Sequence, residues 1–258
     1  QEFAQYYNDR AFFNSSGFSS GTNDYVPSRD PSAYGKGTNW LKAITRTTFT
    51  QNYNLSVSGR SKKTNYYANI GFNDTPGIIR ASGFRRITGR FNINHKFAKW
   101  LEIGYKGSYT FRHIDRNKAS IGGTNIWGGA IYLSPTIGLN DVYNPIYENS
   151  SRFNSPWATI NLNTDYQEQL TNTNVFIATF IPIKGMRIKS QNSYMVYQRH
   201  DYRFYPSTLP RKTENEGAEA YRYEGDARRL TSENTITYDK KLKSELKKYK
   251  KKKREQSF

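Results

Sequence analysis

The chain of 258 residues lacks cysteine, and this absence excludes a disulfide framework and any chemistry that depends on a thiolate. A long apolar run is missing as well. The longest such stretch, from Val175 to Ile183, is interrupted by Thr179 and Pro182, whereas a membrane-spanning helix requires about 18 apolar residues. The sequence therefore excludes a helical membrane protein.

Residues typical of catalytic and metal sites are scarce. The chain has three histidines, His95, His113 and His200. His113 and Asp115 stand two residues apart, but no ligand pair has the i, i+4 spacing of a helical metal site, and we interpret both as polar residues at a rim. The carboxylate pairs Glu216/Glu219 and Asp165/Glu168 and the glycine-rich stretch 122–129 match no catalytic or phosphate-binding motif. We predict no catalytic residue, no cofactor and no metal site, and hence no enzyme.

Acidic residues are few: 21 Asp and Glu stand against 39 Lys and Arg, which gives a formal net charge of +18. The tail from Lys240 to Phe258 carries +8 of this charge, because it has ten Lys or Arg residues and only two acidic residues, Glu245 and Glu255. A lysine run can attract nucleic acid or anionic lipid, but no groove-reading motif and no aromatic platform accompanies this one. We interpret residues 240–258 as a non-native or disordered tail, with a solvated basic tail as the alternative, and predict no nucleic-acid partner.

Aromatic residues, by contrast, are abundant. They make up 16% of the chain, with 21 Tyr and 15 Phe, although the hydrophobic fraction is only 35%. Between Asn52 and Arg112 apolar or aromatic residues occupy every second position, with small, polar or cationic residues between them. A period of two indicates β-strands that have one apolar and one polar face.

Two segments show the alternation most clearly. The apolar set is Ile87, Phe91, Ile93 and Phe97 in the first segment and Leu101, Ile103, Tyr105, Tyr109 and Phe111 in the second. The other face carries Arg86, Arg90, Asn92, Lys96, Lys106 and Arg112. Because unpaired buried charges cost several kcal/mol, we expect the charged face to meet water in a lumen and the apolar face to point outward.

Strand-like runs are predicted at 52–60, 64–73, 84–97, 100–112, 173–183, 186–205 and 229–238. The links between them alternate between short, at 61–63, 98–99 and 184–185, and long, at 74–83, 113–172 and 206–228. Outer-membrane barrels show this asymmetry, with tight periplasmic turns and long extracellular loops, and a β-sandwich has no reason to show it. We predict an all-β fold, an antiparallel transmembrane β-barrel fragment of about seven strands that forms an open, curved sheet.

The long loops hold five aromatic residues that are candidates for contact with a substrate: Trp127, Tyr132, Tyr143, Tyr147 and Trp157. Aromatic rings beside Asn and Asp suit stacking on sugar rings or docking of a partner protein. The alternative is that these rings pack the loops onto each other.

Short motifs recur in order along the chain: Thr-Asn-Trp at 38–40, Gln-Asn-Tyr-Asn-Leu-Ser-Val-Ser-Gly at 51–59, Lys-Thr-Asn-Tyr-Tyr at 63–67, Gly-Ile-Ile at 77–79, Phe-Arg-Arg at 84–86 and Gly-Arg-Phe-Asn-Ile at 89–93. Pro-Ile-Lys-Gly-Met at 182–186 and Glu-Asn-Thr-Ile-Thr-Tyr-Asp at 233–239 continue the series. In this order they resemble the SusC/RagA family of TonB-linked outer-membrane transporters, over almost the whole chain to about residue 240.

The resemblance implies a 22-stranded barrel plugged by an N-terminal domain, in the outer membrane of a Gram-negative, Bacteroidetes-like bacterium. It implies the import of oligosaccharides or peptides. The implied partners are a SusD-like surface lipoprotein, the outer-membrane lipid and TonB, which would act through an N-terminal segment that is missing here. No transport residue carries over by position.

We therefore expect an early-barrel fragment from which the signal segment, the plug and the later strands are absent. Residues 1–239 would be the partial transporter barrel, with 1–50 as an outer loop region and 51–239 as strands and loops. The alternative is a secreted or surface carbohydrate-binding β-protein without transport activity.

Overall fold

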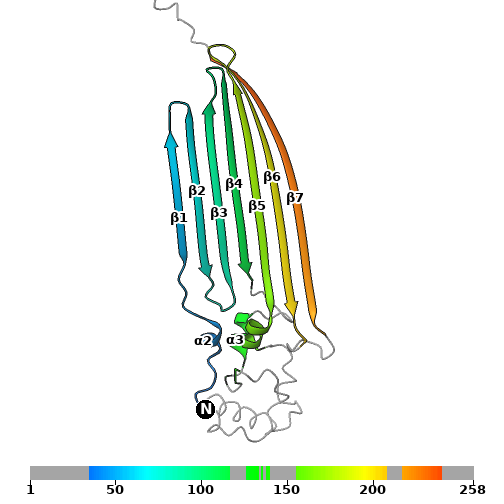
Figure 1. The fold of residues 1–258 in the computed structure, drawn as a ribbon. Helices are drawn as coiled ribbons and strands as arrows, with labels where there is room; N and C mark the ends of the chain where they lie inside the picture. Colours follow the sequence, from blue (N-terminus) through cyan, green and yellow to red (C-terminus); the bar gives the residue numbers. More distant parts are fainter. Residues whose placement is uncertain are drawn as a thin grey trace, which may run out of the picture.

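The computed structural model describes residues 35–116, 126–133, 135, 138–139, 155–207 and 217–239. Seven strands form one antiparallel sheet whose spatial order follows the sequence, and Figure 1 shows it as a single layer. The strands are β1 Gln51–Arg60, β2 Thr64–Pro76, β3 Gly83–Lys96, β4 Leu101–Asp115, β5 Thr164–Phe180, β6 Met186–Tyr205 and β7 Glu219–Tyr238. Three short helices accompany them: α2 Trp40–Ile44, α3 Ile126–Tyr132 and α4 Pro156–Leu162.

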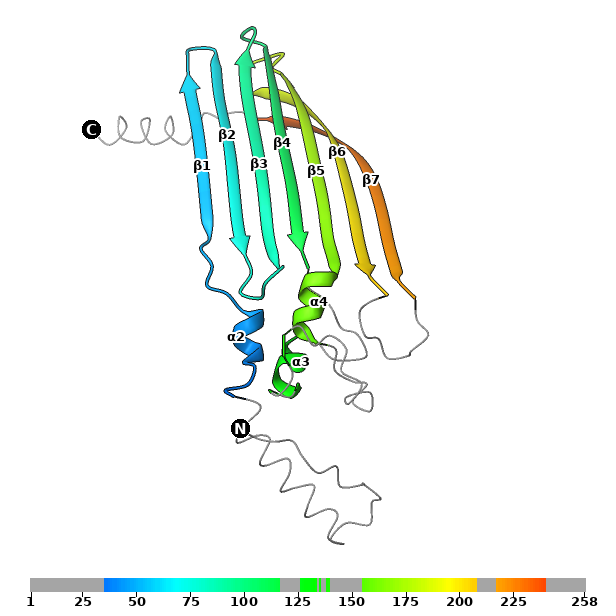
Figure 2. The same cartoon turned by 60° about the horizontal axis from the view of Figure 1, so that its bottom comes forward.

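The sheet is open, as predicted. Within the described part of the chain, β1 pairs only with β2 and β7 only with β6. The strands lengthen across the sheet, from 10 residues in β1 to 20 residues in β6 and β7. Figure 2 shows that the sheet curves from β1 toward β7, which is the shape expected of a segment of a barrel wall.

The predicted alternation of short and long links is confirmed. At one end, tight turns join β1 to β2, β3 to β4 and β5 to β6. The last of these needs Gly185, which has a φ of +93° and where an added Cβ would lie 2.3 Å from the carbonyl oxygen of Asp239. The longer links, between β2 and β3, β4 and β5, and β6 and β7, leave and re-enter the sheet at the other end. We call the two ends the short-turn end and the long-loop end.

The register places the two predicted residue sets on opposite faces. Residues paired across antiparallel strands have their side chains on the same face. Arg86 pairs with Arg112 and Asn92 with Lys106, whereas Ile87 pairs with Phe111 and Ile93 with Tyr105. The cationic set therefore shares a polar face and the aliphatic and aromatic set an apolar face, as the alternation predicted.

The apolar face forms a continuous band across the sheet. On β4 the band runs from Leu101 to Phe111 and on β5 from Leu170 to Phe180, which matches the 9–11 residues that a tilted strand needs to cross a membrane. Neighbouring rings pack within it, with the Tyr105 and Phe176 centroids 5.1 Å apart. Many of these side chains remain exposed, and Leu230 is 81% exposed. An exposed apolar surface of this extent requires lipid or a partner.

Two strand boundaries differ from the prediction. β5 begins at Thr164 rather than 173, and β7 begins at Glu219 rather than 229. Beyond the apolar band these stretches are mostly polar, as in Gln167 and Glu168 on β5, with isolated tyrosines such as Tyr221 and Tyr223 on β7. The apolar alternation that revealed the other strands is absent there, although the backbone ladder continues. The predicted link 113–172 consequently shortens to 116–163 and contains α3 and α4.

The helices lie together at the long-loop end, as Figures 1 and 2 both show. Their buried cluster is Trp40, Ile44, Ile126, Ala130 and Ile160. Asn39 caps α2 by accepting a hydrogen bond from the backbone N–H of Lys42 at 2.9 Å. The guanidinium of Arg46 donates to the carbonyl oxygens of Gly77 and Ser82 and so ties the segment before β1 to the β2–β3 link. We call α2, α3 and α4 the rim helices.

None of the helices in the described ranges is long and apolar enough to span a membrane.

Candidate functional site

The polar face is the largest candidate site, because amide, hydroxyl and charged side chains extend along it in cross-strand rows. One row joins Asn73, Arg86, Arg112 and Gln169, and another joins Asn69, Arg90, Ser108 and Thr173. Adjacent strands lie about 4.8 Å apart, so each row presents hydrogen-bonding groups at a spacing that a single polar ligand can reach. The face offers binding rather than bond-making chemistry.

At the long-loop end, the polar face carries a compact ion cluster. Arg116, directly after β4, donates to Asp165 Oδ1 at 3.2 Å and to Asp201 Oδ2 at 3.3 Å. Arg199 donates to both carboxylate oxygens of Asp201, at 3.0 and 2.7 Å. Arg203 Nε lies 3.5 Å from Asp165 Oδ2. The carboxylate side chains are only 4% and 8% exposed, and a buried charge is tolerated only when it is paired in this way.

Tyrosine rings complete the cluster. The guanidinium carbon of Arg203 lies 5.9 Å from the ring centroid of Tyr205 and 5.8 Å from that of Tyr221. Arg199 lies 5.5 Å from the ring centroid of Tyr223. The contacts with Tyr221 and Tyr223 are cation–π interactions that link the arginines of β6 to β7, whereas Tyr205 lies on β6 itself. The cluster therefore joins β4, β5, β6 and β7 rigidly where the loops begin, and the sequence analysis did not identify it.

The predicted loop aromatics are only partly placed. Trp127 lies on α3 and is 41% exposed, whereas Trp157, on α4, packs against the buried cluster of the rim helices. Tyr132 is the last residue of α3, and its side chain lies outside the described part of the structure, as do Tyr143 and Tyr147 entirely. The structure thus brings the two tryptophans to one helical unit and leaves the three tyrosines as predictions.

A basic hollow lies on the polar face at the short-turn end. Its cations are Arg60, Lys62, Lys63 and Lys96, and its carboxylate is Glu102, which lies 3.4 Å from Lys96. Asn65 and Asn94 add amide groups. The four cations against one carboxylate make this hollow a site of positive potential.

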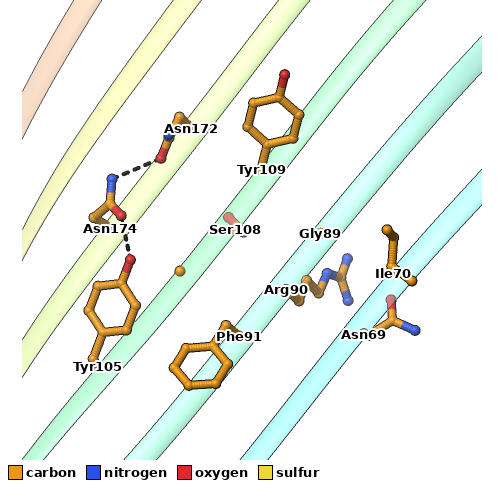
Figure 3. Close-up of a pocket in the computed structure, with 11 residues that line it drawn as sticks. Asn69, Ile70, Gly89, Arg90, Phe91, Tyr105, Ser108, Tyr109, Asn172 and Asn174 are labelled. Carbon is orange, nitrogen blue, oxygen red and sulfur yellow. Dashed lines mark hydrogen bonds between the residues drawn. The ribbon is translucent and has the colours of Figure 1, made fainter. Parts of the chain in front are cut away.

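The apolar face has a shallow depression over β2 to β5, which Figure 3 shows. Gly89 and Gly107 form its floor because they lack side chains. At its edge the Tyr105 hydroxyl donates to Asn174 Oδ1 at 2.6 Å, and Asn174 Nδ2 donates to Asn172 Oδ1 at 2.8 Å. The polar groups inside the apolar band therefore partner one another, which lowers the cost of facing lipid.

The geometry of the described residues does not support the metal-site and acid–base candidates that the sequence offered. His113 lies 3.0 Å from Asp115 and 3.2 Å from Glu168, on the same face as the apolar band but beyond it. No group of three or more potential ligands that could hold a metal ion occurs among the described residues. Asp165 and Glu168 project from opposite faces of β5, so they cannot flank one substrate.

No family model matches the sequence. Among curated proteins, the chain is similar to the TonB-dependent receptor P26 of Formosa agariphila, with 25% identity over 225 residues that cover 83% of this chain and 21% of that protein. It is also similar to the TonB-dependent receptor SusC of Bacteroides thetaiotaomicron, with 28% identity over 133 residues that cover 50% of this chain and 12% of that protein. The chain thus spans about a fifth or less of these relatives.

The sheet also resembles solved structures of the RagAB peptide importer. The closed-closed state matches with a TM-score of 0.66 and 22% identity over 81% of this chain and 24% of that chain. The open-open state matches with a TM-score of 0.65 and 21% identity over 92% of this chain and 30% of that chain. These likenesses confirm the predicted fold as a piece of a transmembrane β-barrel wall.

Proposed function

We propose that this chain is a wall segment of a SusC/RagA-type TonB-dependent transporter, and that the whole protein imports a large nutrient across the outer membrane of a Bacteroidetes-like bacterium. Its similarity to TonB-dependent receptors and to the RagAB fold supports the proposal. The observation that carries the proposal is the two-faced sheet, apolar on one side and hydrogen-bonding on the other. In a membrane, such a wall places its apolar band against lipid and encloses a polar lumen.

The lengths of the links indicate which end of the wall lies outside the cell. Outer-membrane barrels keep tight turns in the periplasm and long loops outside. The rim helices and the ion cluster then lie at the cell surface, where they meet the nutrient first. The basic hollow lies at the periplasmic end.

The nutrient we propose is an oligosaccharide or a peptide too large to pass a passive porin. At the cell surface a SusD-like lipoprotein would capture it, and the exposed side chains of Leu41, Trp127 and Ile131 on the rim helices offer apolar contacts for such a partner. Tyr132, Tyr143, Tyr147 and Trp157 remain candidates for contact with substrate or lipoprotein.

The energy for import has to come from elsewhere. The sequence carries no phosphate-binding motif, and the outer membrane holds no ion gradient to use. We propose that TonB supplies the energy from the inner membrane.

Growth of the source bacterium tests the proposal. Deletion of the gene, or separate inactivation of TonB, is expected to abolish growth on one polymeric nutrient and to leave growth on its monomer intact. Undiminished growth of the deletion strain on every polymer would instead favour a surface binding protein. Accumulation without TonB would indicate a passive pore.

A further inference from the structure

Cations without a carboxylate partner among the described residues are most numerous on the polar face of β1 to β4. Across β1 to β4 this face carries six cations, Arg60, Arg86, Arg90, Lys96, Lys106 and Arg112, and one carboxylate, Glu102. Lys96 lies 3.4 Å from Glu102. For the other five cations, no carboxylate in the described ranges lies within ion-pair distance. By contrast, each arginine of the ion cluster at the long-loop end has an aspartate partner.

The register sets two of these cations directly opposite each other. Arg86 pairs with Arg112, and like charges in directly opposed positions destabilise a sheet. Arg90 and Lys106 continue the series along the same two strands. We call Arg86, Arg90, Lys106 and Arg112 the basic strip. It extends about 20 Å along the strands, at roughly 3.3 Å per residue, and an anion lying on it would relieve the repulsion.

The surroundings of the basic strip indicate what kind of anion fits. On the flanking strands β2 and β5 this face presents mainly amides and hydroxyls, Asn69, Asn73, Gln169, Thr171 and Thr173, although Val175 lies opposite Lys106 and Tyr67 opposite Asn92. Between the cations stand Thr88, Ser108 and Thr110. Phe84 supports Arg86, whose guanidinium carbon lies 5.9 Å from the ring centroid. Hydrogen-bonding groups outnumber apolar side chains along this surface, which suits a ligand rich in hydroxyl groups.

We propose that the basic strip binds an acidic oligosaccharide, one that carries sulfate or carboxylate groups along its length. The inference rests on the proposed function, in which the polar face lines an import lumen. Arginine forks bind planar or tetrahedral oxyanions through paired hydrogen bonds. The strip runs along the transport axis toward the basic hollow of Arg60, Lys62, Lys63 and Lys96, so that anionic groups meet cations from one end of the wall to the other.

Binding to the full-length receptor that contains this segment tests the inference. The probes are a short dextran sulfate, unsulfated dextran of the same length and an oligoglutamate. The sulfated sugar is expected to bind most tightly and to weaken steeply with added salt. The double variant R86Q/R112Q should bind it at least about tenfold more weakly, since hydrogen bonds to charged groups contribute that much or more.

Arg85→Gln is the matched control, because Arg85 precedes Arg86 but lies on the opposite face. It should leave binding of the sulfated sugar unchanged. If the double variant fails to assemble, Arg90→Gln alone should still weaken binding, and unchanged binding there would overturn the inference.

Three other results would overturn the inference while leaving TonB-dependent growth, and hence the proposed function, intact. Equal binding of dextran and dextran sulfate would show that the charge of the ligand does not contribute to binding. Tighter binding of oligoglutamate would indicate an acidic peptide. A loss of thermal stability in R86Q/R112Q with unchanged probe preference would show that the cations pair with an acidic segment of the protein itself.

Discussion

Asp201 is the residue on which the ion cluster depends most. It accepts hydrogen bonds from both Arg116 and Arg199, and its side chain is 8% exposed. Without its charge, Asp165 would be the one carboxylate left in the cluster for Arg116, Arg199 and Arg203. The attachment of β4 to β6 at the long-loop end would weaken with it.

Asp201→Asn is therefore expected to destabilise the full-length barrel by about 3–5 kcal/mol, the range observed when one partner of a buried ion pair is removed. Asp226→Asn is the matched control, because Asp226 pairs with Arg228 at 3.3 Å in an exposed position. It should cost no more than about 1 kcal/mol. Thermal unfolding in detergent measures both, and equal shifts would show that the cluster is not a structural joint.

The ion cluster also shows which contacts between residues can be predicted from the sequence and which cannot. Arg199, Asp201 and Arg203 stand at every second position, so their common face follows from a period of two. Their partners Arg116 and Asp165 come from other parts of the chain, and the registers of β4 with β5 and of β5 with β6 bring them together. A single sequence shows the alternation of side chains along one strand, but it does not show the register between neighbouring strands.

At the scale of elements, the strands were predicted within the apolar band and missed where they extend beyond it. β1 to β4 and β6 were placed within a few residues, whereas β5 and β7 begin well before their predicted starts. The rim helices were missed altogether. They are 5 or 7 residues long, too short for a helical period to stand out, and they exist because they pack on each other.

Truncation of Ile44 tests whether the rim helices are stabilised by packing on each other. It is 0% exposed, and truncating a buried aliphatic side chain costs about 2–5 kcal/mol. Ile44→Ala should therefore loosen α2, α3 and α4 without changing the thermal stability of the barrel. Limited proteolysis of the full-length protein should show faster cleavage within residues 35–50 and 155–163.

Leu41→Ala on the same helix provides the control, because Leu41 is 43% exposed and its truncation should leave cleavage unchanged. If Ile44→Ala lowers the stability of the whole barrel, the rim helices are part of the barrel's folding unit rather than a separate one.

At the scale of the whole molecule, the open edges of the sheet are its defining feature. Within the described part, neither outer edge of β1 or β7 has a partner, and a lipid-embedded sheet must satisfy every backbone group by closure. The fold class, the facing and the open curvature were all predictable, because they follow from a period of two and from link lengths. The acidic oligosaccharide proposed above could not be inferred in this way, since the basic strip that suggests it combines side chains from separate strands.

The most direct test of this account is a scan of single cysteines along β3, from Arg86 to Lys96, in the full-length receptor. The segment has no cysteine of its own, so each introduced thiol in it is unique. A fluorophore on each thiol is quenched by brominated lipid when it faces the membrane. We predict quenching with a period of two, strong at Ile87, Phe91 and Ile93 and weak at Arg86, Arg90 and Asn92. Uniform quenching, or a pattern of the opposite phase, would contradict the assignment of the apolar face to lipid.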